Sequence, residues 1–360
     1  MPAQTPISAA DAINPAFQHA KQQLFEPFRF AQWARLAFVG LLAGEMGSGG
    51  GCHSGFHPGP THHHLGGAPF ATGFPWHFAH HPALPAGVIA FLVVSGLALF
   101  LVFTYINSVM RFILFDSIVS KQCHIRQGWV RNTGRGLRLF VWQLLLTLAA
   151  FSAFFVLIGV PVAGAFSAGW FSRPREHVLP LVLFGVGLFL LLIVFVALLA
   201  VVHVMTKDFV VPQMALENIS AIEGWQRLWS WLKAEKLGYA GYIGMKIVMA
   251  MGAGIAIGIV TLFVLLMLLV PVGGMGVIAV LAAKAAGLTW NFQTIALAVI
   301  AGLITLLLIM FVISLVAVPA IVFFPAYSIY FLAPRYAPLA SLLWPQPASP
   351  SPQSPPLSPA

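Results

Sequence analysis

The chain has 360 residues, of which 59% are hydrophobic and only 8% are charged, and its mean hydropathy is +0.91. A soluble globular protein of this length needs far more polar surface, so the composition excludes that class and indicates an integral membrane protein. The net charge of +9 is attributed to membrane topology and to anionic lipid, and no nucleic-acid partner is expected.

Residues 1–35 form a leader of mixed polarity that we expect to lie in the cytoplasm. Asn14-Pro15 predicts an N-cap followed by the first position of a helix. Apolar residues then recur at helical spacing, which favours a short helix lying on the membrane surface. We expect no signal peptide, because the first apolar run begins only after this leader.

Six apolar runs of the chain can each be assigned to a transmembrane helix. A helix needs about 20 residues to cross ~30 Å of hydrocarbon, and continuous apolar runs predict helices and not barrel strands. The runs lie near residues 30–46, 87–110, 138–164, 180–206, 238–270 and 293–323. The first run spans only if Arg35 reaches the interface along its aliphatic stem. The sequence thus predicts an all-α, polytopic membrane domain over residues 36–333 with about six transmembrane helices.

A Gly-, His- and Pro-rich segment, residues 47–86, separates the first two runs and should face the periplasm. It holds Cys52 and eight candidate metal ligands: His53, His57, His62, His63, His64, His77, His80 and His81. Imidazole and thiolate groups bind Zn²⁺, Cu and Ni²⁺. The Gly and Pro content offers no scaffold for tetrahedral geometry, so we favour a low-complexity linker and expect no cofactor.

One polar element of the chain occurs twice. The later copy contains Lys207, Gly224, Trp225 and Arg227, and the same spacing upstream is occupied by Arg111, Gly128, Trp129 and Arg131. The segments VPVAG at 160–164 and VPVGG at 270–274 would end corresponding spans. We interpret the unit as an interfacial helix followed by a transmembrane hairpin, repeated over about residues 111–206 and 207–323.

The later copy predicts an amphipathic helix in the cytoplasmic interface. Ser220 and Glu223 form a capping-box pattern, so the helix should begin there. Its apolar residues share one arc and its polar residues the other, as in helices that lie at headgroup depth. The candidate interface anchors of the two copies are Trp129, Arg131, Trp225, Arg227 and Trp229.

Within the fifth run, Ala250, Gly254 and Gly258 form a small-xxx-small series, which predicts close packing of another helix. His203 and Lys246 lie near the cytoplasmic ends of their spans, where interfacial placement or snorkelling explains them. The centres of the spans lack ionisable residues, which argues against a proton-coupled carrier.

Basic residues outside the spans gather in the segments that contain both termini and the two repeated elements. The positive-inside rule places these segments in the cytoplasm. We therefore expect a multi-pass protein of the bacterial inner membrane with cytoplasmic N and C termini. Residues 334–360 include a Pro/Ser-rich stretch and are expected to be a disordered tail.

The arrangement FVVP, ALE and GWxRLW within residues 209–229 resembles the membrane domain that accompanies some bacterial glycerophosphodiester phosphodiesterases, and related uncharacterised multi-pass proteins. This resemblance covers roughly residues 90–330 and implies a helical bundle in the bacterial inner membrane. It does not carry over the phosphodiesterase activity, because no loop is long enough for a catalytic barrel of about 250 residues.

No nucleophile elbow, P-loop or zincin motif occurs, and no catalytic residue is assigned. We expect a non-enzymatic, lipid-associated or accessory membrane module. Its expected partners are the lipid bilayer, anionic lipids within it, and a membrane protein or a second copy of the chain. Two alternatives stay open: a transporter or channel for a small or lipid-like solute, and an envelope metal-binding protein.

Overall fold

The computed structural model describes residues 8–45, 86–171, 177–287 and 291–344, and all regular structure in these ranges is helical. The elements are α1 (Ile13–Phe25), α2 (Phe30–Leu42), α3 (Ala86–Val119), α4 (Ile125–Ser167), α5 (Val178–Met205), η3 (Thr206–Val210), α6 (Val211–Glu217), α7 (Ala221–Ala234), α8 (Lys236–Ala285), α9 (Phe292–Leu332), η4 (Ala333–Arg335) and α10 (Ala337–Leu343). The expected all-α class is confirmed.

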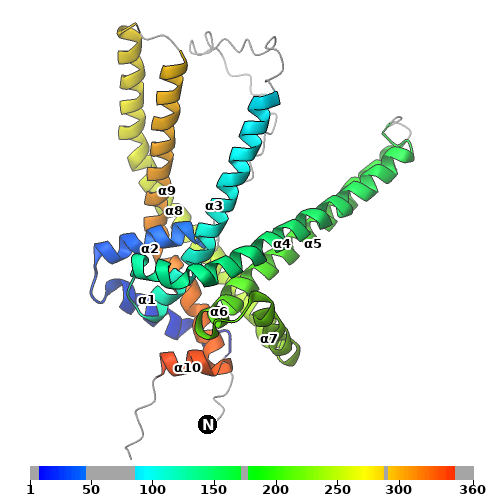
Figure 1. Cartoon of the computed structure of the whole chain (residues 1–360), viewed down its shortest axis with the longest axis vertical. Helices are drawn as coiled ribbons and strands as arrows, with labels where there is room; N and C mark the ends of the chain where they lie inside the picture. The colour runs from blue at the N-terminus through cyan, green and yellow to red at the C-terminus, as the bar shows by residue number, and fades with distance from the viewer. Residues whose placement is uncertain (1–7, 46–85, 172–176, 288–290, 345–360) are drawn as a thin grey trace, which may run out of the picture.

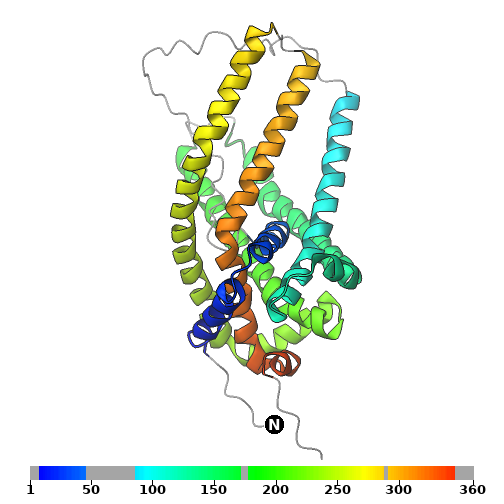
Figure 2. The same cartoon turned by 90° about the vertical axis from the view of Figure 1, so that its left-hand side faces the viewer.

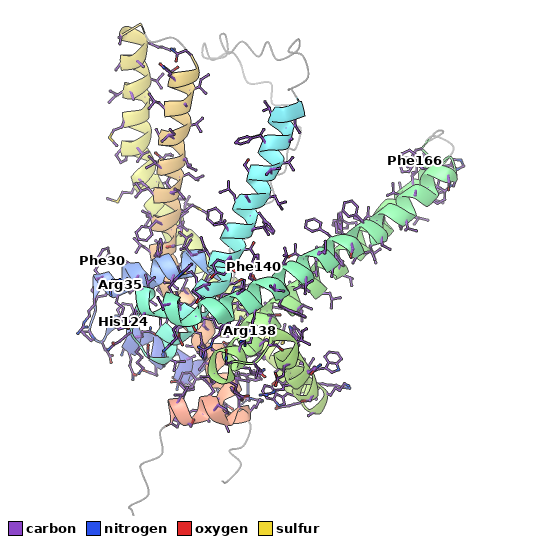
Figure 3. The ribbon with its side chains drawn as sticks, viewed as in Figure 1. Phe30, Arg35, His124, Arg138, Phe140 and Phe166 are labelled. Atoms are coloured by element: carbon purple, nitrogen blue, oxygen red, sulfur yellow. The ribbon has the colours of Figure 1, made fainter. Side chains whose placement is uncertain are left out.

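Three arms leave a common base and separate from one another (Figure 1). They are α3, the α4–α5 hairpin and the α8–α9 hairpin, and the turned view shows α3, α8 and α9 rising from the base (Figure 2). Phe166 lies at the far end of the α4–α5 arm, whereas Arg35 and His124 lie at the base (Figure 3). The short helices α1, α2, α6, α7 and α10 build that base.

Five helical stretches of the described chain are long and apolar enough to cross a membrane: Gly87–Val119, Ile125–Ser167, Val178–Glu217, Lys236–Ala285 and Gln293–Arg335. The most apolar window of each has 0% of its residues buried inside the protein. Such a surface would be strongly unfavourable in water but matches the hydrocarbon of a bilayer. The structure is therefore consistent with a multi-pass membrane protein.

The first apolar run does not form a sixth helix of that kind. α2 has 13 residues, which is about 20 Å of helix against ~30 Å of hydrocarbon. It crosses the direction of the arms (Figure 1) and packs on α3 and α9. At Gly40 an added Cβ would lie 2.6 Å from the side chain of Ile321, so α2 uses its apolar face for a protein contact.

The leader helix α1 caps the end of α3. The helix expected after Asn14 is present, although it begins at Ile13. His19 Nε2 and Gln23 Nε2 donate hydrogen bonds of 2.9 Å to backbone carbonyls near the end of α3, those of Ile118 and Ser117. The last carbonyls of a helix have no partner within the helix, so these bonds fasten the leader to the first arm.

Aromatic side chains form the centre of the base. Phe209, Tyr239, Tyr242, Tyr327 and Phe331 are all no more than 1% exposed. The rings of Tyr242 and Tyr327 stack with centroids 5.1 Å apart and planes within 6°. This packing joins η3, the start of α8 and the end of α9, so it positions the polar groups that these elements carry.

The two copies of the polar element begin their helices in a similar way. An added Cβ at Gly128 of α4 would lie 3.1 Å from Ile113, and one at Gly224 of α7 would lie 2.8 Å from Val210. In both places the glycine lets the preceding helix come close. The copies differ afterwards, because α4 runs on as one helix to Ser167, whereas α7 and α8 are separate helices.

Three predicted boundaries are wrong. The VPVAG and VPVGG segments do not end their helices, since Pro161 and Pro271 lie inside α4 and α8. Proline removes one backbone hydrogen bond and does not by itself stop a transmembrane helix. The predicted C-terminal tail also starts too early, because α10 packs into the base with Leu339 fully buried; residues 345–360 lie outside the described chain.

Candidate functional site

Five charged side chains meet where the arms leave the base. We call Glu45, Arg111, Lys207, Asp208 and Lys246 the charge cluster. Each is at least nine-tenths buried: the residues Glu45, Arg111, Asp208 and Lys246 are 3%, 7%, 2% and 6% exposed, and the Lys207 side chain is 10% exposed. Arg111 lies about 12 Å before the end of α3, and Lys246 lies about 15 Å after the start of α8. The cluster therefore lies where the apolar runs meet the base.

Two ion pairs organise the charge cluster. Lys207 pairs with Glu45, and Lys246 pairs with Asp208. Tyr242 Oη also donates a 2.9 Å hydrogen bond to Asp208 Oδ2. Removing one partner of such a buried pair leaves a charge without compensation, which costs about 3–5 kcal/mol.

Arg111 is only partly satisfied. Its Nη2 lies 3.1 Å from His203 Nε2, and its Nε lies 3.4 Å from the carbonyl oxygen of Ala43. A guanidinium only donates, so His203 accepts through Nε2 and its ring is neutral. Arg111 Nη1 and Asp208 Oδ1 have no hydrogen-bond partner.

A small cavity lies beside Arg111 and Asp208. Its volume is about 30 Å³, and its lining includes Glu45, Arg111, Lys207 and Asp208. That space holds about one or two water molecules. The cavity is therefore a site for a very small group, and four charged residues border it.

Two adjacent residues of the π-helical turn η3 serve different partners. Lys207 and Asp208 both lie in η3, and Lys207 pairs with Glu45, three residues beyond the end of α2, whereas Asp208 pairs with Lys246 of α8. π-helical turns widen the helix locally and are frequent at functional sites. The snorkelling explanation for Lys246 is wrong, because this lysine is 6% exposed and paired inside the protein.

An apolar groove begins at Glu45 and extends between α8 and α9. Its volume is about 350 Å³, and its other lining residues are Gly254, Ile257, Gly258, Thr261, Leu262, Leu265, Ile313, Ala317, Ala320 and Ile321. Small residues on both helices leave this space open. We call it the α8–α9 groove.

Two residues of the predicted helix-packing series lie at this groove. Gly254 and Gly258 line the α8–α9 groove, whereas Ala250 does not. No atom of another element lies within 4 Å of a Cβ added at Gly258. No close helix contact therefore lies at Gly258, and helix packing by the series Ala250, Gly254 and Gly258 stays a prediction.

The two tryptophans predicted to anchor α7 lie in different environments. Trp225 Nε1 donates a 3.1 Å hydrogen bond to Thr206 Oγ1, and its ring lies 6.4 Å from that of Trp142. Trp229 is 54% exposed, with Lys233 Nζ 5.7 Å from its ring. Only the Trp229 ring of the two points away from the protein, and its place in a lipid interface stays a prediction.

Arg227 is held by two carboxylates. It pairs with Glu217 and, at 2.9 Å, with Glu223. Tyr336 Oη donates a 2.8 Å hydrogen bond to Glu217, and burial together with this carboxylate raises the pKa of Tyr336. Through Arg227, the polar face of α7 is thus connected to Glu217 of α6 and, through Glu217, to Tyr336.

In the upstream copy, Trp129 is half-buried with its ring 6.2 Å from that of Tyr105. Arg131 pairs with Asp116, and its side chain is 61% exposed. Both Arg131 and Asp116 line a cleft of about 640 Å³ at the base, whose walls are partly polar and partly apolar. Nearby, Arg138, which is labelled in Figure 3, donates a 2.7 Å hydrogen bond from Nη1 to the carbonyl of Asn218 and so connects α4 to the residue after α6.

The eight candidate histidine ligands and Cys52 fall in residues 46–85, outside the described chain. Among the described residues, no group of three or more His, Cys, Asp and Glu side chains is arranged to hold a metal ion. Metal binding by the histidine-rich segment stays a prediction.

Residues 7–342 match the model of a family described as "Family of unknown function (DUF7544)". The chain belongs to this family. The comparison with curated proteins found no match, and the comparison with solved structures found none. Membership supplies no activity, and the resemblance to the phosphodiesterase-associated membrane domain stays a prediction.

No sequence motif connects the residues of the charge cluster. Glu45 stands in no motif, and the neighbouring Lys207 is a local partner for Asp208 in the sequence. The signal in the sequence is Arg111 directly after one apolar run and Lys246 inside another, because ionisable residues at such places commonly pair with each other or mark a site.

Proposed function

We propose that the protein is a non-enzymatic membrane module that holds a lipid in the α8–α9 groove. The groove is the observation that carries this proposal. It has apolar walls on two helices that are suited to cross a membrane, and its volume of about 350 Å³ lies in the range of ligand sites. The component of a bilayer that fits an apolar groove of this kind is an acyl chain.

We place the base of the molecule in the cytoplasm and the arms in the bacterial inner membrane. The basic side chains of α4 and α7 lie at the base, which supports this orientation. In this arrangement five helices cross, α2 stays at the inner side and the exposed ring of Trp229 meets the interface. The glycine contacts at the starts of α4 and α7 support two repeated units.

Filling the groove tests the proposal. Gly258→Leu adds a side chain where a Cβ meets no atom within 4 Å, so it should occupy the groove without a clash. Native mass spectrometry of protein extracted with its lipids should then show less retained lipid than the wild type. Gly252→Leu is the matched control, because its Cβ is equally free and it does not line the groove; equal retention by both variants would refute the proposal.

Transport of a small or lipid-like solute is the second candidate. It is favoured by the buried ion pairs and the π-helical turn at the junction of the three arms, since such groups mark pathways in membrane proteins. Reconstituted protein would distinguish the two functions: a transporter moves its solute into proteoliposomes, whereas a lipid-binding module retains lipid without flux.

A further inference from the structure

We propose that the charge cluster makes the lipid site selective for an anionic phospholipid, with one phosphate oxygen at Arg111 and one acyl chain in the α8–α9 groove. This inference rests on the proposed lipid-binding function and names the class of lipid. It places the headgroup and the chain in two spaces that share one wall, because Glu45 lines both the small cavity and the groove.

The first argument is the balance of charge. Within the cluster, Arg111, Lys207 and Lys246 carry three positive charges, and Glu45 and Asp208 carry two negative ones. The neutral ring of His203 adds none. One positive charge therefore has no counterpart in the cluster, and at the edge of a low-dielectric region it attracts an anion strongly.

The second argument is the free donor of Arg111. Nη1 has no hydrogen-bond partner although the residue is only 7% exposed. A guanidinium presents its donors in a planar fork that suits phosphate oxygens. Arg111 also lines the small cavity, so a guanidinium with one unused donor borders a space that admits a phosphate oxygen.

The size of the cavity decides how much of the headgroup enters. About 30 Å³ accommodates one or two water-sized groups, so one oxygen fits and the rest of the headgroup stays outside. A water molecule in this cavity carries no charge, so it would leave the positive charge uncompensated. The charge and the free donor together favour the anion.

The test measures lipid preference in nanodiscs of equimolar phosphatidylcholine and phosphatidylglycerol. Native mass spectrometry should show phosphatidylglycerol enriched about fivefold among the lipids retained by the wild type, as expected for one basic group at a membrane surface. Arg111→Gln should abolish the enrichment while lipid is still retained. Arg126→Gln removes the same charge from an exposed position in the first turn of α4 and should leave the enrichment unchanged.

Arg111→Lys keeps the charge without the fork and should keep part of the enrichment, which provides a readout if the glutamine variant does not fold. Excess inorganic phosphate should not displace the lipid; displacement would identify a site for free phosphate and overturn the inference. Wild-type protein that retains both lipids in their bulk ratio would also overturn it, with the proposed function intact. Protein that retains no lipid at all would instead refute the proposed function.

Discussion

The buried ion pair between Asp208 and Lys246 joins two elements of the base. Both residues are nearly fully buried, and Tyr242 donates a further hydrogen bond to the same carboxylate oxygen. Buried charges are tolerated only when they are compensated. The pair therefore holds η3 against α8 at the junction of the arms.

Asp208→Asn should destabilise the folded protein by about 3–5 kcal/mol, because Lys246 would keep a buried charge without a counterion. The measurement is thermal unfolding in detergent at neutral pH. Glu26→Gln is the control, since Lys21 and Glu26 form a pair whose side chains are 54% and 55% exposed, and such pairs contribute at most about 1 kcal/mol. Equal losses in the two variants would contradict the assigned role of the buried pair.

The sequence of α7 predicts where this helix begins, but it does not predict which of its residues another element covers. The capping box of α7 is partly observed, since the Ser220 side chain accepts from the backbone of Glu223 at 3.2 Å, and the helix begins at Ala221 as expected. Its apolar arc is divided, however, between the protein side at Trp225 and the outer side at Trp229. A helical wheel defines an apolar arc but not which part of it another element covers.

Docking of α1 should weaken as the pH falls. Burial lowers the pKa of the His19 imidazole, whose Nε2 donates to a carbonyl near the end of α3 and whose Nδ1 lies 3.2 Å from Tyr330 Oη. Because the folded state binds the proton less well than the unfolded state, the stabilisation is complete above the unfolded pKa of about 6.5 and declines below it. The protection factors of the α1 amides, which correct for the intrinsic pH dependence of hydrogen exchange, should therefore fall below about pH 6.5. His19→Gln should remove this pH dependence, and an unchanged dependence would exclude His19 as its source.

The molecule combines a packed base with arms that pack little against one another. The arms expose apolar surface on nearly all sides and are suited to lipid, whereas the aromatic core and the ion pairs lie in the base. The chain carries most of its basic residues there as well. This division between a lipid-facing and a polar part is the basis for the orientation that we propose.

Reporter fusions can test that orientation. Fusions at Gln127 and Lys236, at the starts of α4 and α8, should report the cytoplasm, because basic residues resist translocation. Fusions at Gly59 and at Gly169, the latter beyond the end of α4, should report the opposite side. The same signal at Gln127 and Gly169 would mean that α4 does not cross, and a cytoplasmic signal at Gly59 would contradict the predicted periplasmic segment.

The sequence by itself determined the membrane class, the all-α architecture and the position of five long helices, because continuous apolar runs are local features that require helices in lipid. Only the tertiary structure decided that α2 packs across the arms, that Trp225 turns inward and that the charge cluster exists. Glu45 and Lys207 are 162 residues apart, and Asp208 and Lys246 are 38 apart, so no local pattern connects them. Which charges share a buried site depends on how the helices approach one another, and this chain brings them together only at the base of its three arms.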